Sequence, residues 1–167
     1  MRSRRALLAV LLCCVPAAAV HAQSFHSSVA SLAGLTGVEI VVEDMSPGLQ
    51  QLGLAELTLR TDVELRLRRA GIRVLGQVEA CDSLPCVYIH VTATTGPRLS
   101  AYFVHVGLQQ MVNLTRDSSF AFSVETWHAL GRVGMVTGDE LPRRVLDAVR
   151  SEVAQFVNAF HNANPGH

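Results

Sequence analysis

The chain has 167 residues, of which 49% are hydrophobic, and its 14 basic side chains are balanced by 14 acidic ones. Three arginines lie in the first five residues, so the rest of the chain carries 11 basic and 14 acidic side chains, a net charge of about −3. This mild balance argues against a nucleic-acid binder, which would present a basic stripe, and against electrostatic docking on anionic lipid.

The first 22 residues have the pattern of a secretory signal peptide. The arginines precede an apolar run from Ala6 to Val15, and small residues follow up to Ala22. This is the order of a positive end, an apolar middle and a small-residue cleavage site, and the run is shorter than the roughly 20 residues of a membrane span. We therefore expect an exported protein that begins at Gln23 and acts in the periplasm or outside the cell.

Four cysteines divide into two pairs. Cys13 and Cys14 lie in the apolar run, where Leu12 is not the small residue that lipid attachment requires, so the sequence does not favour an anchor, although it leaves one open. Cys81 and Cys86 remain after cleavage, and in an oxidising compartment so close a pair predicts a disulfide. A redox pair and a metal site stay open as alternatives, but the four-residue spacer is not Cys-x-x-Cys.

The first half of the mature chain predicts a strand, a helix and a strand. Residues 23–36 are small and polar and indicate a flexible lead-in to a single domain over 37–165. Val38–Val42 is a β-branched run typical of a buried strand, residues 45–53 predict a loop, and apolar residues on one face predict a helix over 54–70. With a second strand over 72–78, this succession predicts a parallel pair.

The second half predicts three more strands and a long helix. The strands are expected over 87–94, 99–114 and 120–136, with a bend or bulge near Gly107. The helix is expected over 141–163, because large apolar residues recur at helical spacing, namely Val145, Val149, Val153, Phe156 and Phe160. The expected fold class is α+β: a two-layer sandwich in which two helices cover one face of a mixed, mainly antiparallel sheet of about five strands.

Four segments of the sequence form a recognisable pattern: Leu59–Ile72 (LRTDVELRLRRAGI), Leu108–Val112, Glu125–Trp127 with Gly131 and Gly134, and Phe156–Phe160 with Asn164-Pro165. Together they resemble a group of small exported bacterial proteins with no assigned activity. The resemblance covers about residues 37–165 and implies the same fold as the residue pattern, but it implies no function. The Cys81–Cys86 loop is not part of the pattern.

The most informative surface is predicted on a hairpin that folds about Gly96-Pro97. Because side chains alternate along strands, four aliphatic residues share one face, Ile89, Val91, Val104 and Val106. The other face collects a semi-polar, aromatic set, Tyr88, His90, Thr92, Ala101, Phe103 and His105. We expect the aliphatic face to contact the helices and the second face to lie open.

Three interpretations compete for His90 and His105. They are ordinary half-exposed strand residues, or they belong with Tyr88 and Phe103 to a partner-binding surface, or they ligate a metal. The metal interpretation lacks the third ligand that a catalytic zinc usually has, although an acid such as Glu125 is a candidate. The sequence contains no nucleophile elbow, phosphate-binding glycine loop or His-Glu-x-x-His motif, so no catalytic residue and no cofactor are assigned.

The leading hypothesis from sequence is therefore a non-enzymatic module that binds a protein or cell-envelope component through the open face or a sheet edge. The alternative is a small metal protein or enzyme that uses His90 and His105, and a homo-oligomer formed through the open face is a third possibility. We expect no nucleic-acid partner and no membrane span after cleavage.

Overall fold

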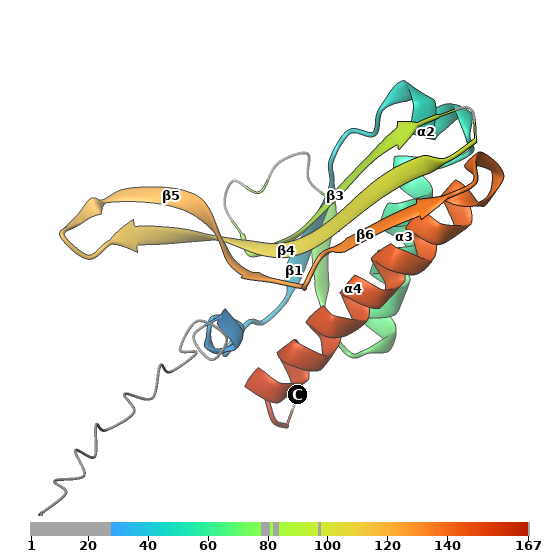
Figure 1. Ribbon diagram of the computed structural model, residues 1–167. Helices are drawn as coiled ribbons and strands as arrows, with labels where there is room; N and C mark the ends of the chain where they lie inside the picture. The colour runs from blue at the N-terminus through green and yellow to red at the C-terminus, as the bar shows by residue number, and fades with distance from the viewer. Residues whose placement is uncertain (1–27, 78–80, 82–83, 97, 167) are drawn as a thin grey trace, which may run out of the picture.

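The computed structural model describes residues 28–77, 81, 84–96 and 98–166 (Figure 1). The predicted signal peptide, residues 1–22, lies outside the described residues, as do residues 23–27 of the predicted lead-in. In the described part of the chain, no helix combines the length and the apolar character needed to cross a membrane.

The fold is a mixed sheet of six strands with helices packed on it, as the predicted α+β sandwich requires. The strand order is β2-β1-β3-β4-β5, and β6 also pairs with β4. β1 pairs in parallel with both β2 and β3, whereas β4 is antiparallel to β3, β5 and β6. The strand bounds are β1 Val38–Val42, β2 Val74–Gln77, β3 Cys86–Thr95, β4 Ser100–Leu114, β5 Asp117–His128 and β6 Arg132–Val136.

One predicted strand is in fact two. The sequence predicted a single strand over 120–136, but β5 ends at His128 and β6 begins at Arg132. Gly131 between them has φ +74°, a left-handed conformation that glycine adopts at little cost. Both strands pair with the same edge of the long β4, β5 along its second half and β6 along its first. The sheet therefore has six strands rather than about five.

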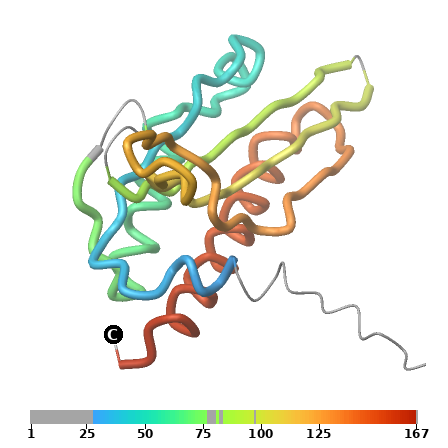
Figure 2. Tube along the Cα trace, turned by 90° about the vertical axis from the view of Figure 1, so that its left-hand side faces the viewer, coloured from blue at the N-terminus to red at the C-terminus, as the bar shows by residue number. Residues whose placement is uncertain are grey.

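The helices cover one face of the sheet. α3 (Glu56–Arg69) packs on β1, and α4 (Leu141–Ala163), which begins and ends as predicted, packs on β4 (Figures 1 and 2). Of the residues predicted on their inner faces, Ala70 is partly buried against the core and the others are fully buried, namely Leu59, Val63, Leu67, Val145, Val149, Val153, Phe156 and Phe160. A short helix, α2 (Pro47–Gln51), lies where a loop was predicted, and a 3-10 turn, η1 (Gly138–Glu140), precedes α4.

The described start of the chain packs against this core. Residues 28–34 form a helical turn followed by a turn, and Leu32 and Leu35 are buried. Asn164, just after α4, accepts a hydrogen bond from the Gly34 amide at 2.8 Å and donates one to the Leu32 carbonyl at 3.0 Å. Ser31 Oγ donates to the Thr126 carbonyl of β5 at 3.1 Å, so this segment, where sequence alone predicted a flexible lead-in, connects β5 with the end of α4.

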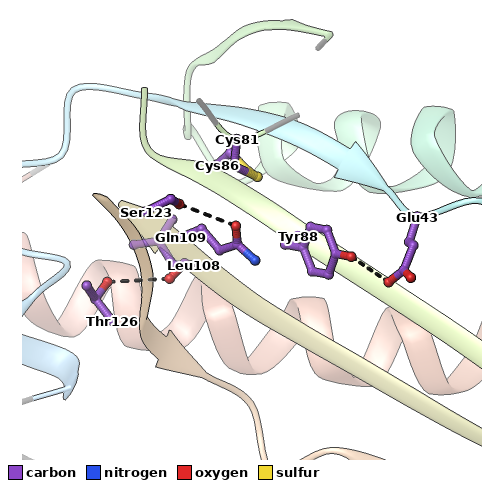
Figure 3. Close-up of a disulfide and its surroundings, with 8 residues drawn as sticks. All are labelled: Glu43, Cys81, Cys86, Tyr88, Leu108, Gln109, Ser123 and Thr126. Carbon is purple, nitrogen blue, oxygen red and sulfur yellow. Dashed lines mark hydrogen bonds between the residues drawn. A yellow bond between two sulfur atoms is a disulfide. The ribbon is translucent and has the colours of Figure 1, made fainter. Parts of the chain in front are cut away.

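The predicted disulfide is present and covers one end of the other sheet face. Cys81 and Cys86 are bonded, with their Cα atoms 5.6 Å apart (Figure 3). Both are buried and form a small second core with Val41, against which Tyr88 packs. β1 is consequently buried along its whole length, because α3 covers one side and this cluster contributes to the cover of the other.

Beyond β3, the strands β4 and β5 continue as a projecting two-stranded arm. β3 pairs with β4 only up to Gln109, whereas the β4–β5 pairing extends to Leu114. Figure 1 shows the arm reaching past the helices, and Figure 2 views it nearly end-on. The arm is not backed by the helix layer.

Candidate functional site

The candidate site is the face of β3 and β4 that points away from the helices. Ile89, Val91, Val104 and Val106 are buried against the helix layer, and Tyr88, His90, Phe103 and His105 are half-buried on the opposite side. His90 and His105 are direct cross-strand partners. The alternation predicted from sequence therefore places the four candidate residues on one continuous surface, which we call the open face.

A first carboxylate, Glu43, binds two of the predicted residues. The Tyr88 hydroxyl donates to Glu43 Oε2 at 2.5 Å (Figure 3), and His90 Nδ1 contacts the same oxygen. Glu43 follows β1 in phase with Val41, and its own amide donates to the Ile89 carbonyl at 2.9 Å, which fixes it beside β3. Two side chains of β3, Tyr88 and His90, thus share one acceptor oxygen.

This contact shifts two pKa values in opposite directions. The hydrogen bond from Tyr88, and then the contacts with His90, lower the pKa of Glu43 despite its partial burial. Burial, followed by the neighbouring Glu43 carboxylate, raises the pKa of Tyr88 to about 12. Tyr88 is therefore protonated at neutral pH and acts as a hydrogen-bond donor, not as a nucleophile.

A second carboxylate, Glu125 on β5, bridges two histidines. Its Oε2 lies 2.6 Å from His105 Nε2, and its Oε1 lies 3.0 Å from His128 Nδ1. The imidazole rings of His105 and His128 have centroids 5.9 Å apart. Each histidine therefore binds its own carboxylate oxygen, and the pair is held as a three-residue cluster.

Two local features aim Glu125 at this position. The β4–β5 register shifts between Leu108 and Gln109, so that Thr126 is an extra residue, a β-bulge that re-aims the neighbouring side chain. Gly107 supplies the space, because a Cβ there would lie 2.2 Å from Glu125 Oε2. The predicted bend or bulge near Gly107 is therefore found as a bulge opposite Leu108 and Gln109, and it positions the carboxylate of Glu125.

Phe103 lies between the two clusters. Its ring centroid is 6.2 Å from that of His105, with the planes 18° apart, and 6.3 Å from that of His90. On its other side, Phe103 pairs with Val133 of β6, which is exposed. The open face is thus polar and acidic toward β1 and β5, with an aromatic centre that continues into an apolar margin on β6.

Sequence reasoning missed two members of the open face, Glu43 and His128. Glu43 contacts His90, and His128 pairs with Glu125 and lies beside the ring of His105. Two signals in the sequence could have found them. Glu43 comes two residues after Val41 and therefore lies on the same side of the sheet, and His128 comes three residues after Glu125. Trp127, by contrast, packs in the core, edge-on to Phe156 with centroids 5.3 Å apart.

The metal interpretation finds one of its expected contacts and not the other. Glu125 does meet His105, but His90 binds Glu43 instead of joining them. Within the described residues, no group of three or more His, Cys, Asp or Glu is arranged to hold a metal ion. Compared with known proteins, the chain matches no family model and no curated protein.

Proposed function

We propose that this protein is an exported, non-enzymatic binding module, which acts in the periplasm or outside the cell and binds a protein or cell-envelope component through its open face. One observation carries the proposal: the helices cover only one side of β3 and β4 and leave Tyr88, His90, Phe103 and His105 half-exposed on the other. Aromatic residues beside polar ones are typical of interface centres.

Two further observations support this proposal. The histidines and carboxylates are already paired with one another, so the surface is ordered before any partner binds and loses less conformational entropy on binding. The disulfide supports export, because such bonds persist in oxidising compartments.

The test compares the wild-type protein with a triple variant, His90→Ala/Phe103→Ala/His105→Ala, as baits for solubilised cell envelopes. We expect a partner recovered by the wild type to be lost with the triple variant. The matched control is Leu57→Ala/Leu65→Ala, which removes exposed side chains from α3 in the other layer. Circular dichroism checks that each variant is folded. Recovery of the same partners by wild type and triple variant refutes the proposal.

The alternative from sequence, a metal protein or enzyme that uses His90 and His105, has the His105–Glu125 contact in its favour. Elemental analysis of the purified mature protein distinguishes it from the proposed function. Stoichiometric zinc, copper or iron that is lost in a His90→Ala/His105→Ala variant would favour the alternative.

A further inference from the structure

A groove of about 530 Å³ lies beside the second half of α4. Its walls come from three segments that are far apart in the sequence: residues 28–29 at the start of the described chain, residues 127–130 at and just after the end of β5, and residues 155–162 of α4. This volume falls within the range of ligand-binding sites in proteins, about 300–1,000 Å³. The groove is therefore large enough to hold a ligand.

Hydrogen bonds hold the walls of the groove in place. Gln155 Oε1 accepts from the Leu130 amide at 3.3 Å, and Gln155 Nε2 donates to Glu152 Oε1 at 3.1 Å. On the side of the described start of the chain, Ser31 Oγ donates to the Thr126 carbonyl at 3.1 Å. The groove is consequently formed before a ligand arrives, which lowers the entropy cost of binding.

Trp127 brings to the groove a hydrogen-bond donor that has no acceptor. The residue is only 5% exposed and lines the groove. Its Nε1 donates no hydrogen bond to any described residue, and this atom is not sealed from solvent. A buried indole N–H usually has a partner. An acceptor on a ligand in the groove would supply the missing one.

α4 presents two carboxamides to the same groove, Asn158 and Asn162. Their side chains are exposed and make no hydrogen bond to other described residues. They are one turn apart, a rise of about 6 Å along the helix. In an extended peptide, backbone groups that point to one side recur every second residue, at about 6.6–6.8 Å. Because each carboxamide both donates and accepts, the pair matches the backbone of a peptide that lies along the helix.

The rest of the lining favours an uncharged segment with an apolar side chain. Leu130 is 79% exposed, and Val29 and Ala159 add further apolar surface. None of the described residues that line the groove is arginine, aspartate or glutamate, and the lining residue His128 is held by Glu125. A charged ligand would lose hydration here without gaining an opposite charge.

We propose that this groove is a peptide-binding site, which takes an extended, uncharged segment of a partner protein. The backbone of the segment pairs with the carboxamides of Asn158 and Asn162, one of its carbonyl oxygens accepts from Trp127 Nε1, and an apolar side chain contacts Leu130. The site contains none of the open-face residues Tyr88, His90, Phe103 and His105, so it does not rest on the proposed function.

The first test uses the indole N–H signal of Trp127 in a nitrogen–proton NMR spectrum, which is unambiguous because the protein has one tryptophan. The purified mature protein is titrated with a library of capped, uncharged pentapeptides that each carry one apolar residue. In matched libraries an arginine or a glutamate replaces one polar residue. We expect uncharged peptides to move the indole signal, and their charged counterparts to bind at least about tenfold more weakly.

Maltose is the probe for the competing class of ligand, an uncharged saccharide. An indole signal that no peptide moves, or that only maltose moves, overturns the proposal. Equal binding of charged and uncharged peptides also contradicts it, because the groove would then not select by charge.

The second test locates the site with variants and the tightest-binding peptide of the library. Asn158→Ala/Asn162→Ala removes both carboxamides from exposed positions, so we expect the dissociation constant to rise at least about tenfold. The matched control is Gln51→Ala, which removes an exposed carboxamide from α2 and should leave the dissociation constant unchanged. Circular dichroism checks that each variant is folded. Equal affinities of the wild type and the double variant refute the site.

The triple variant His90→Ala/Phe103→Ala/His105→Ala separates this site from the open face. It leaves the groove intact, so we expect it to bind the peptide as tightly as the wild type does. Loss of peptide binding in the folded triple variant would place the peptide on the open face and overturn the proposal for the groove.

Discussion

At the scale of single residues, the open face depends on an absent side chain. Gly107 leaves the space over β4 that Glu125 fills, and from there its carboxylate contacts both His105 and His128. A glycine within a strand usually weakens it, since it adds chain entropy and no packing. Here the missing Cβ is explained by the close approach of another side chain.

Gly107→Ala should therefore displace Glu125 and destabilise the protein. The added methyl group overlaps Glu125 Oε2, Cδ and Cγ at 2.2, 2.8 and 3.2 Å, so the flexible side chain must move and lose its histidine contacts. We expect a loss of about 1 kcal/mol, the low end of the range for overpacking. Urea denaturation measures it.

Two controls define this result. Gly76→Ala in β2 meets nothing within 4 Å, so we expect no loss there. In a Glu125→Ala background, Gly107→Ala should cost much less, because the clashing group is gone. A Gly107→Ala penalty that is the same with and without Glu125 would show that the space serves another purpose.

At the scale of elements, α4 positions β6 as well as packing on the core. Glu152→Ala removes the acceptor of the Gly131 amide and the buried partner of Arg132, so we expect a loss of about 2–3 kcal/mol in the free energy of unfolding. Glu140→Ala, which removes exposed pairs with two arginines near the start of the same helix, should cost less than about 1 kcal/mol. Equal losses in the two variants would argue against the bridging role of Glu152.

An ionic contact between α3 and α4 predicts a pH dependence of stability. Asp62 on α3 accepts hydrogen bonds from Arg150 on α4 at 3.1 and 3.2 Å and from Arg66 at 2.8 Å. Burial raises the pKa of Asp62, but the hydrogen bonds from the two arginines outweigh it, so the pKa lies below its ordinary value of 3.8. Because the pKa is lowered on folding, the contact stabilises the protein fully above the ordinary value of 3.8. This stabilisation is lost as the pH falls through the lower pKa of the folded state.

Asp62→Asn should therefore lower the free energy of unfolding by about 1 kcal/mol at pH 7, and the gap to wild type should close below about pH 4. Urea denaturation at several pH values measures the gap. Asp147→Asn, which removes a more exposed partner of Arg150 at 3.5 Å, is the control and should change little. A gap that persists unchanged at pH 3 would contradict the ionic account.

Elements with a strong local pattern were predictable from sequence, and those fixed by tertiary contacts were not. The helical spacing of apolar residues predicted the bounds of α4, and the β-branched run Val38–Val42 predicted β1. The division of residues 120–136 into β5 and β6 was missed, because it depends on a left-handed Gly131 held by Glu152 from a distant helix. The face shared by His90 and His105 followed from alternation alone, but Glu43 and Glu125 came to it through strand pairing and a bulge.

At the scale of the whole molecule, one sheet has two different faces. The helices bury one, and the other carries two histidine–carboxylate clusters around Phe103, with an apolar margin on β6. The first face contributes buried apolar surface to the core, and the second carries ordered polar contacts. This asymmetry is the basis of the proposed binding function.

The most direct measurement is photocrosslinking in intact cells that produce the protein, with a photoreactive residue at position 103 and, in a second protein, at position 57 on α3. The proposed function predicts one reproducible foreign partner from position 103, identified by mass spectrometry, and not from position 57. Crosslinks from position 103 that are confined to copies of the same chain, or a complete lack of crosslinks, would contradict it.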